Sequence, residues 1–263
     1  MKFRLLVVFP FAFAALFAVV ATLAGQAALG SVLVTENEVG KLAALVGCFA
    51  AALAFESGDY LRRAWFFSGL CYLLLLAADV VGMPSFASHL SDQALDLTQG
   101  VLVVVANATS VAGTWMLAHA WSVAGLEDDR SRGAGRLLFG GAILLALAIT
   151  GWPLLLDVRT LLAGDFGAVV SIASDLGDTI CLALIAPVMQ TALAMRGGVL
   201  RWPWGLLTSS GIAWLAYDAS SALHLEHRWL VLSEALRALA CGAFLSAGIA
   251  QRLAVAPDTR SAG

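Results

Sequence analysis

Charged residues are scarce in this chain of 263 residues. They make up 13% of it, whereas hydrophobic residues make up 60%, and the mean hydropathy is +0.88. Soluble globular domains carry about 25% charged residues, so the composition excludes an ordinary soluble domain and favours a membrane protein. The net charge is only −3 and no long basic run occurs, which argues against a nucleic-acid partner.

Several residues that carry chemistry in membrane proteins are also rare. Lysine occurs only at positions 2 and 41, so the last predicted helices lack the lysine that a retinal protein requires. The four cysteines all fall in apolar segments without C-x-x-C spacing, which favours small core residues over disulfides or metal ligands. His119 is the one histidine expected at membrane depth, and one imidazole cannot supply the paired axial ligands of a b-type haem. We therefore predict no metal and no cofactor.

Motifs of hydrolytic and phosphate chemistry are missing as well. The sequence contains no H-E-x-x-H, no histidine boxes for a di-iron centre, no phosphate-binding loop and no G-x-S-x-G. No pattern places a nucleophile beside a base. The sequence therefore predicts that this protein is not an enzyme.

Long apolar runs fill most of the chain instead. About 20 apolar residues cross a bilayer, and eight such runs with short loops leave no room for a sizeable soluble domain. The sequence therefore predicts an all-α polytopic membrane protein with eight transmembrane helices. The predicted spans cover residues 5–25, 39–55, 64–81, 97–123, 137–156, 166–195, 203–223 and 229–254. We expect the first span to be retained, because its apolar run is long for a signal peptide, which is the alternative.

The predicted third and seventh spans resemble each other. Aligned without a gap, LRRAWFFSGLCYLLLLAAD (61–79) and LRWPWGLLTSSGIAWLAYD (200–218) place Asp79 opposite Asp218. The segment EVGK (38–41) likewise resembles DLGD (175–178), which places Lys41 opposite Asp178. These matches predict two parallel four-helix repeats, residues 1–130 and 131–254, followed by a disordered tail at 255–263.

The basic residues predict the orientation. With a cytoplasmic N-terminus, eleven of the fifteen Lys and Arg residues fall in predicted inside segments or next to them. Cytoplasmic loops carry the excess of positive charge. We therefore predict that both termini face the cytoplasm, and we expect a bacterial cytoplasmic (inner) membrane.

Seven charged residues fall within or beside the predicted spans, in the half that faces outward. A charge inside a bilayer is costly unless it is paired or hydrated, so these residues are candidate ligand- or ion-binding groups. Salt bridges that lock the bundle are the alternative interpretation. The five carboxylates outnumber the two bases, which favours a polar, outward-facing pocket. The candidates are Lys41, Asp79, Asp175, Asp178, Asp218, Glu234 and Arg237.

Arg237 has the clearest expected contact among these candidates. Its guanidinium keeps its charge and cannot lie unpaired in a membrane. Glu234 is one helical turn away. We predict that Arg237 also contacts Asp79, Asp175, Asp178 or Asp218 across a helix interface.

The string L-R-R-A-W at 61–65, followed by an apolar run that ends in A-D at 78–79, resembles one known kind of module. Multi-pass input modules that precede diguanylate cyclase or histidine kinase domains in bacteria have similar helices. Residues 200–218 are similar, so the resemblance covers about 40 residues in total. It implies a membrane sensor, although no output domain follows here, and therefore a separate signalling partner.

Three functions fit these observations. The first is a sensor or accessory module with an acidic pocket between the repeats. The second is a small ion-coupled transporter, because duplicated bundles with carboxylates at the midplane are typical of carriers. The third is a structural subunit of a membrane complex. Access to the pocket from one side or from both distinguishes the first two.

Overall fold

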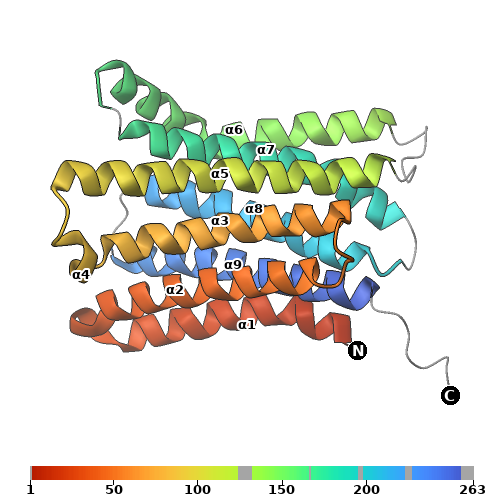
Figure 1. Cartoon of the computed structure of the whole chain (residues 1–263), viewed down its shortest axis with the longest axis horizontal. Coiled ribbons are helices and arrows are strands. Elements are labelled where there is room, and N and C mark those ends of the chain that lie inside the picture. The colour runs from red at the N-terminus through yellow and green to blue at the C-terminus, as the bar shows by residue number, and fades with distance from the viewer. Residues whose placement is uncertain (1, 124–131, 166, 195–197, 223–226, 256–263) are drawn as a thin grey trace.

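The computed structural model describes residues 2–123, 132–165, 167–194, 198–222 and 227–255. Within these residues the protein is built of helices and contains no strand, which confirms the all-α prediction. Eight long helices run side by side, and one short helix, α4, lies at the end opposite the two termini (Figure 1). The helices are α1 (Lys2–Leu23), α2 (Gly25–Ala52), α3 (Tyr60–Gly82), α4 (Pro84–Ala87), α5 (Asp92–Val123), α6 (Arg132–Leu162), α7 (Ala168–Ala194), α8 (Arg201–Ala222) and α9 (His227–Val255).

Six of the long helices, namely α1, α3, α5, α6, α7 and α9, are long and apolar enough to cross a membrane. Helices α2 and α8, with 28 and 22 residues, are also long enough for a crossing. They are more polar, because α2 carries Glu36, Glu38 and Lys41 in its middle and α8 carries five serine and threonine residues and Asp218. The fold is that of a multi-pass helical membrane protein, and the crossings by α2 and α8 stay a prediction.

Helix α2 differs most from the predicted spans. It begins at Gly25 and not near residue 39, so the polar residues at 35–38 lie inside the helix. The reason lies in the turn before it, where Ala24 alone separates α1 from α2. Gly25 has a φ of 67°, a left-handed conformation that glycine adopts at little cost. The chain therefore reverses without a loop, and α2 places its polar residues among neighbouring helices.

Other boundaries agree more closely with the predictions. Helices α7 and α9 begin and end within two residues of the predicted spans, whereas α6 extends beyond its predicted span at both ends. The predicted loop at 82–96 contains α4 and the first turn of α5. Residues 124–131, between the predicted fourth and fifth spans, and nearly all of the tail predicted at 255–263 lie outside the described residues.

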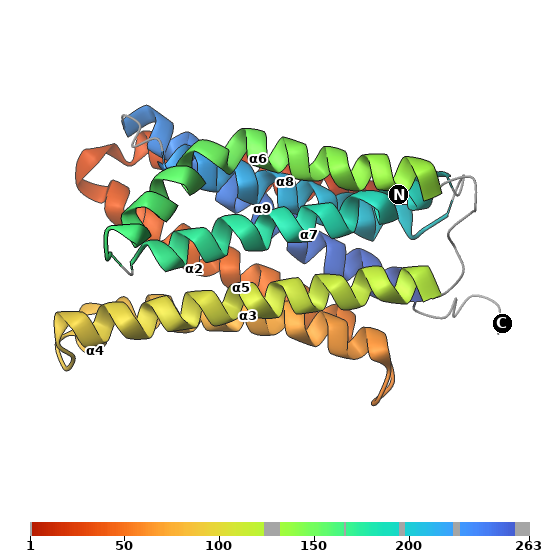
Figure 2. The same cartoon turned by 90° about the horizontal axis from the view of Figure 1, so that it is seen from above.

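Six helices close into a ring. Helix α2 packs on α3, α3 on α5, α5 on α7, α7 on α8, α8 on α9, and α9 on α2. Helices α1 and α6 stay outside this ring, where α1 packs mainly on α9 and α6 mainly on α7. Figure 2 shows α3 and α5 on one side of the bundle and α6, α8 and α9 on the other. Two tandem repeats would give this ring order, although their superposition by rotation stays a prediction.

The bundle end at which α1 begins and α9 ends is filled by large aromatic side chains. Trp65, Trp121 and Trp204 are all nearly inaccessible and belong to one apolar cluster. The ring centroids of Trp121 and Trp204 lie 5.5 Å apart, and those of Trp65 and Phe244 lie 6.3 Å apart. We call this cluster of three tryptophans and Phe244 the tryptophan plug. Tryptophans near helix ends are typical of a membrane-surface belt, but these three pack between helices.

Helices α2 and α9 approach each other most closely beside this plug. A Cβ atom added at Gly248 would lie 2.0 Å from the backbone oxygen of Gly47. A Cβ atom added at Gly47 would lie 2.5 Å from the Cα atom of Leu245. Small residues permit such backbone contact between membrane helices. The two glycines therefore fix the distance between α2, from the first half of the chain, and α9, from the second.

Replacing Gly248 by alanine should consequently destabilise the bundle. The added methyl group would force α2 and α9 apart, and overpacking of this kind costs about 1–3 kcal/mol. Thermal unfolding of the purified protein measures the loss. Gly141→Ala on α6 is the matched control, because a Cβ atom there meets nothing within 4 Å. A Gly248→Ala protein as stable as the Gly141→Ala protein would contradict this packing.

Candidate ligand cavity within the helix ring

A cavity of about 200 Å³ lies inside the helix ring. All six ring helices contribute to its wall, and most of their contributions come from near the middle of the helix. The wall combines polar, charged and aromatic side chains. It includes Asn37 and Lys41 of α2, Tyr72 of α3, Asn107 and Ser110 of α5, Ser174 and Asp178 of α7, Trp214, Tyr217 and Asp218 of α8, and Arg237 and Phe244 of α9.

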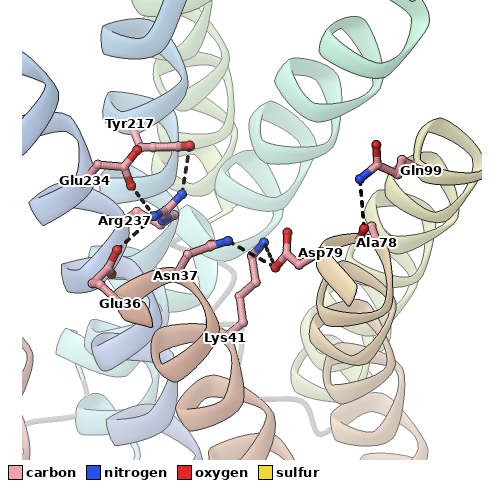
Figure 3. Close-up of polar contacts among 9 residues, drawn as sticks. All are labelled: Glu36, Asn37, Lys41, Ala78, Asp79, Gln99, Tyr217, Glu234 and Arg237. Carbon is pink, nitrogen blue, oxygen red and sulfur yellow. Dashed lines mark hydrogen bonds and ion pairs between the residues drawn. The ribbon is translucent and has the colours of Figure 1, made fainter. Parts of the chain in front are cut away.

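Arg237 is the centre of a buried charge cluster between α2, α8 and α9. Its guanidinium donates a 2.9 Å hydrogen bond to Glu36 of α2 and forms an ion pair with Glu234, one turn earlier on α9 (Figure 3). It also donates to the hydroxyl of Tyr217 at 3.3 Å, and its central carbon lies 5.4 Å from the centre of that ring. Both carboxylates and the guanidinium are buried. The cluster ties the two halves of the chain together.

Lys41 forms a second charge cluster, between α2 and α3. Its ammonium group lies 2.7 Å from the Asp79 carboxylate, which also accepts a 3.1 Å hydrogen bond from the Asn37 side chain (Figure 3). Lys41 is only 8% exposed. Both basic residues of the cavity wall are therefore neutralised by carboxylates of the protein itself.

Carboxyl groups gather on the opposite side of the cavity. Asp178 of α7 and Asp218 of α8 both line it and lie within hydrogen-bonding reach of each other. Asp175 lies one turn before Asp178 and is close enough to Asp218 for their charges to interact. Asp175 is buried, and Asp178 makes no ion pair with any described residue. Negative charge or bound protons therefore concentrate on this wall.

Aromatic rings and small polar groups complete the wall. The indole of Trp214 donates a 3.3 Å hydrogen bond to the Tyr72 hydroxyl and packs edge-on against Tyr217. The Asn107 amide donates to the Ser174 hydroxyl at 3.1 Å, which joins α5 to α7. The cavity thus offers rings and hydrogen-bonding groups close to its carboxyl groups.

Six of the seven predicted site residues belong to this arrangement. Lys41, Asp178, Asp218 and Arg237 line the cavity, and Asp79 and Glu234 form ion pairs with its two bases. Asp175 lies behind the wall and is not among the lining residues. The sequence analysis missed Glu36, because the polar run at 35–38 did not belong to a predicted span. When Glu36 is added to the predicted site residues, their carboxylates outnumber the two bases, Lys41 and Arg237, by a larger margin.

The prediction for Arg237 was wrong about its partner. We expected Asp79, Asp175, Asp178 or Asp218 across a helix interface, but the carboxylate that Arg237 meets there is Glu36. The early start of α2 explains the difference, because it brings Glu36 beside α9. The expected pair with Glu234 is present.

No protein-family model matches the chain, and no curated protein or solved structure is significantly similar to it. The class of the protein therefore follows from its fold, which is a multi-pass helical bundle with a polar cavity.

The Arg237–Glu36 pair predicts a specific pattern of stability. Arg237→Met leaves two buried carboxylates without their cation, and breaking a buried pair typically costs about 3–5 kcal/mol. Adding Glu36→Gln to Arg237→Met should restore part of the lost stability, because it removes one of the two uncompensated negative charges. Thermal unfolding of the single and double variants measures both effects.

Asp218→Asn is the matched control for this restoration. It removes a carboxylate from the same cavity, whereas the carboxylates that pair with the guanidinium are Glu36 and Glu234, so it should not rescue Arg237→Met. Equal rescue by Glu36→Gln and Asp218→Asn would contradict the pairing.

Proposed function

We propose that this protein is a multi-pass membrane sensor or accessory module that binds a small polar solute in the ring cavity. One observation carries the proposal, namely a cavity lined by charges and aromatic rings near the middle of six membrane-length helices. Polar groups at this depth are costly and mark ligand or ion sites. A volume of about 200 Å³ is below the 300–1,000 Å³ of pockets for drug-sized ligands, which favours a solute of few atoms.

The packing below the cavity favours a sensor over a carrier. Phe244 both lines the cavity and packs on Trp65, so the tryptophan plug begins where the cavity ends. Gly47 and Gly248 hold α2 and α9 in backbone contact beside it. A carrier would have to open this end in order to release its solute, and that opening would separate tightly packed backbones. We propose that solute enters only from the end at which α4 lies, which we expect to face outward.

The proposed sensor would act through a partner. A solute that binds to Asp178 of α7 or Tyr217 of α8 would displace these side chains and their helices. The displacement would pass along the ring, because each ring helix packs on two others. The resemblance of residues 61–79 to sensory input modules supports a signalling partner in a bacterial inner membrane. A small ion-coupled carrier remains the alternative.

Accessibility of a single cysteine distinguishes the two. Ser174→Cys, in a background in which the four native cysteines are replaced by alanine, places a thiol in the cavity wall. We expect a small, charged methanethiosulfonate reagent to modify it from the α4 end only, as measured in right-side-out and inside-out vesicles. Leu144→Cys on α6 is the control, because this exposed side chain lies outside the ring and should be shielded by lipid.

Each alternative result has a clear meaning. Modification of Ser174→Cys from both faces would overturn the sensor proposal and favour the carrier. Modification from neither face would contradict a solute-accessible cavity. Thermal unfolding of the cysteine-free background confirms beforehand that it is folded.

A further inference from the structure

A second cavity lies on the outside of the helix ring, between α1, α8 and α9. Its volume of about 470 Å³ is more than twice that of the ring cavity, and no residue lines both. Helix α1 packs closely on α9 but only slightly on α8, so the space between α1 and α8 stays open as a groove. We call it the α1–α8 groove. Its wall includes Val7 and Phe11 of α1, Trp202 and Leu206 of α8, and Leu239 of α9.

The groove has the length and the character of a surface for an acyl chain. Besides Arg201 and Ser209, its lining residues are apolar or aromatic. The Ser209 hydroxyl already donates a 2.9 Å hydrogen bond to the backbone oxygen of Gly205. From residue 201 to residue 209 the groove runs about 12 Å along α8, at 1.5 Å per residue. One leaflet of a bilayer contributes about 15 Å of hydrocarbon, so the groove extends through most of one leaflet.

Arg201 places a positive charge at one end of this apolar groove. Its central carbon lies 4.8 Å from the centre of the Trp202 ring. Trp202 in turn stacks on Phe3 of α1, with ring centroids 6.1 Å apart and an interplanar angle of 11°. Arg201 is exposed and forms no ion pair with a described residue, whereas the bases of the ring cavity are neutralised by carboxylates. The stack of aromatic rings therefore holds a guanidinium that can bind an external anion.

The combination of a guanidinium with an apolar groove matches an anionic phospholipid. The planar guanidinium fits a phosphate group through two parallel hydrogen bonds. Arg201 begins α8 at the bundle end where α1 also begins, which we expect to face the cytoplasm. Anionic lipids of the cytoplasmic leaflet attract basic residues, and basic pockets between membrane helices bind their headgroups.

We propose that the α1–α8 groove binds one anionic phospholipid, with an acyl chain along the groove and the phosphate group on the Arg201 guanidinium. The acyl chain fills the space that α1 and α8 leave between them. The bound lipid thereby links α1, which lies outside the ring, to the ring helix α8. This site is separate from the ring cavity and does not depend on the solute proposed for it.

Native mass spectrometry of the full-length protein in detergent measures the affinity for the first lipid bound. The probes are dioleoyl-phosphatidylglycerol, which is anionic, and dioleoyl-phosphatidylcholine, which has the same chains and no net charge. We expect the wild-type protein to bind phosphatidylglycerol more tightly. Arg201→Gln should weaken the binding of phosphatidylglycerol about tenfold, because a charge-assisted hydrogen bond is lost. It should change the binding of phosphatidylcholine much less.

Arg252→Gln is the matched control for the headgroup contact. Arg252 is an exposed arginine in the last turn of α9, at the same end of the bundle, and it does not line the groove. Its replacement should leave the affinity for phosphatidylglycerol unchanged. An equal affinity of the wild-type and Arg201→Gln proteins for phosphatidylglycerol would overturn the proposal. An equal loss in Arg201→Gln and Arg252→Gln would overturn it too, because it would indicate attraction by the general positive charge only.

Ser209→Trp tests the acyl-chain contact. Ser209 is exposed and lines the groove, so an indole at this position should fill the groove and weaken the binding of both lipids. Leu144→Trp is the control, because this exposed side chain lies on α6, away from the groove. Thermal unfolding shows whether both variants are folded, and Arg201→Gln decides if Ser209→Trp is not.

Two further results would overturn the proposal. Unchanged lipid binding in Ser209→Trp would show that the lipid binds elsewhere on the protein. A wild-type dimer that Ser209→Trp dissociates would show that a second copy of the chain occupies the groove.

Discussion

The structure depends on the neutralisation of charge inside an apolar bundle. Helix α2 carries Glu36 and Lys41 near its middle, and neither residue is tolerable there alone. Arg237 of α9 forms an ion pair with Glu36, and Asp79 of α3 forms an ion pair with Lys41. The position of α2 between α3 and α9 follows from these two ion pairs together with the close contact at Gly47. Helix α2 thus needs a charged partner on each side, and the other ring helices are arranged around it.

Hydrophobic runs predicted most of the helices, because a segment of about 20 apolar residues has few alternatives to a helix in a membrane. The prediction of helix boundaries failed where a polar run interrupts the apolar residues. Residues 35–38 read as Thr-Glu-Asn-Glu, a composition typical of loops, and only tertiary contacts show that they lie within α2. Helix boundaries near such polar runs depend on partners that lie far away in the sequence.

The candidate site was predictable in composition but not in pairing. The depth of Lys41, Asp178, Asp218 and Arg237 marked them as candidates, and the structure places all four around one cavity. Their partners were not evident, because Glu36 and Arg237 are separated by 201 positions and no local spacing links them. The sequence analysis also missed Tyr72 and Trp214 as parts of the site, because no local spacing links them to the charged residues. Aromatic residues are common in apolar helices, and only their position in the ring gives them a role.

The single-residue turn between α1 and α2 has a consequence for how the protein is made. A helix with Glu36, Glu38 and Lys41 in its middle is a poor substrate for insertion by itself. Helix α1 is the most apolar of the long helices, and Gly25 joins it to α2 without a loop. The two can therefore enter the bilayer as one hairpin, with α1 supplying the hydrophobicity that α2 lacks. The charges of this hairpin stay without their partner until α9, which is synthesised later, brings Arg237 to Glu36.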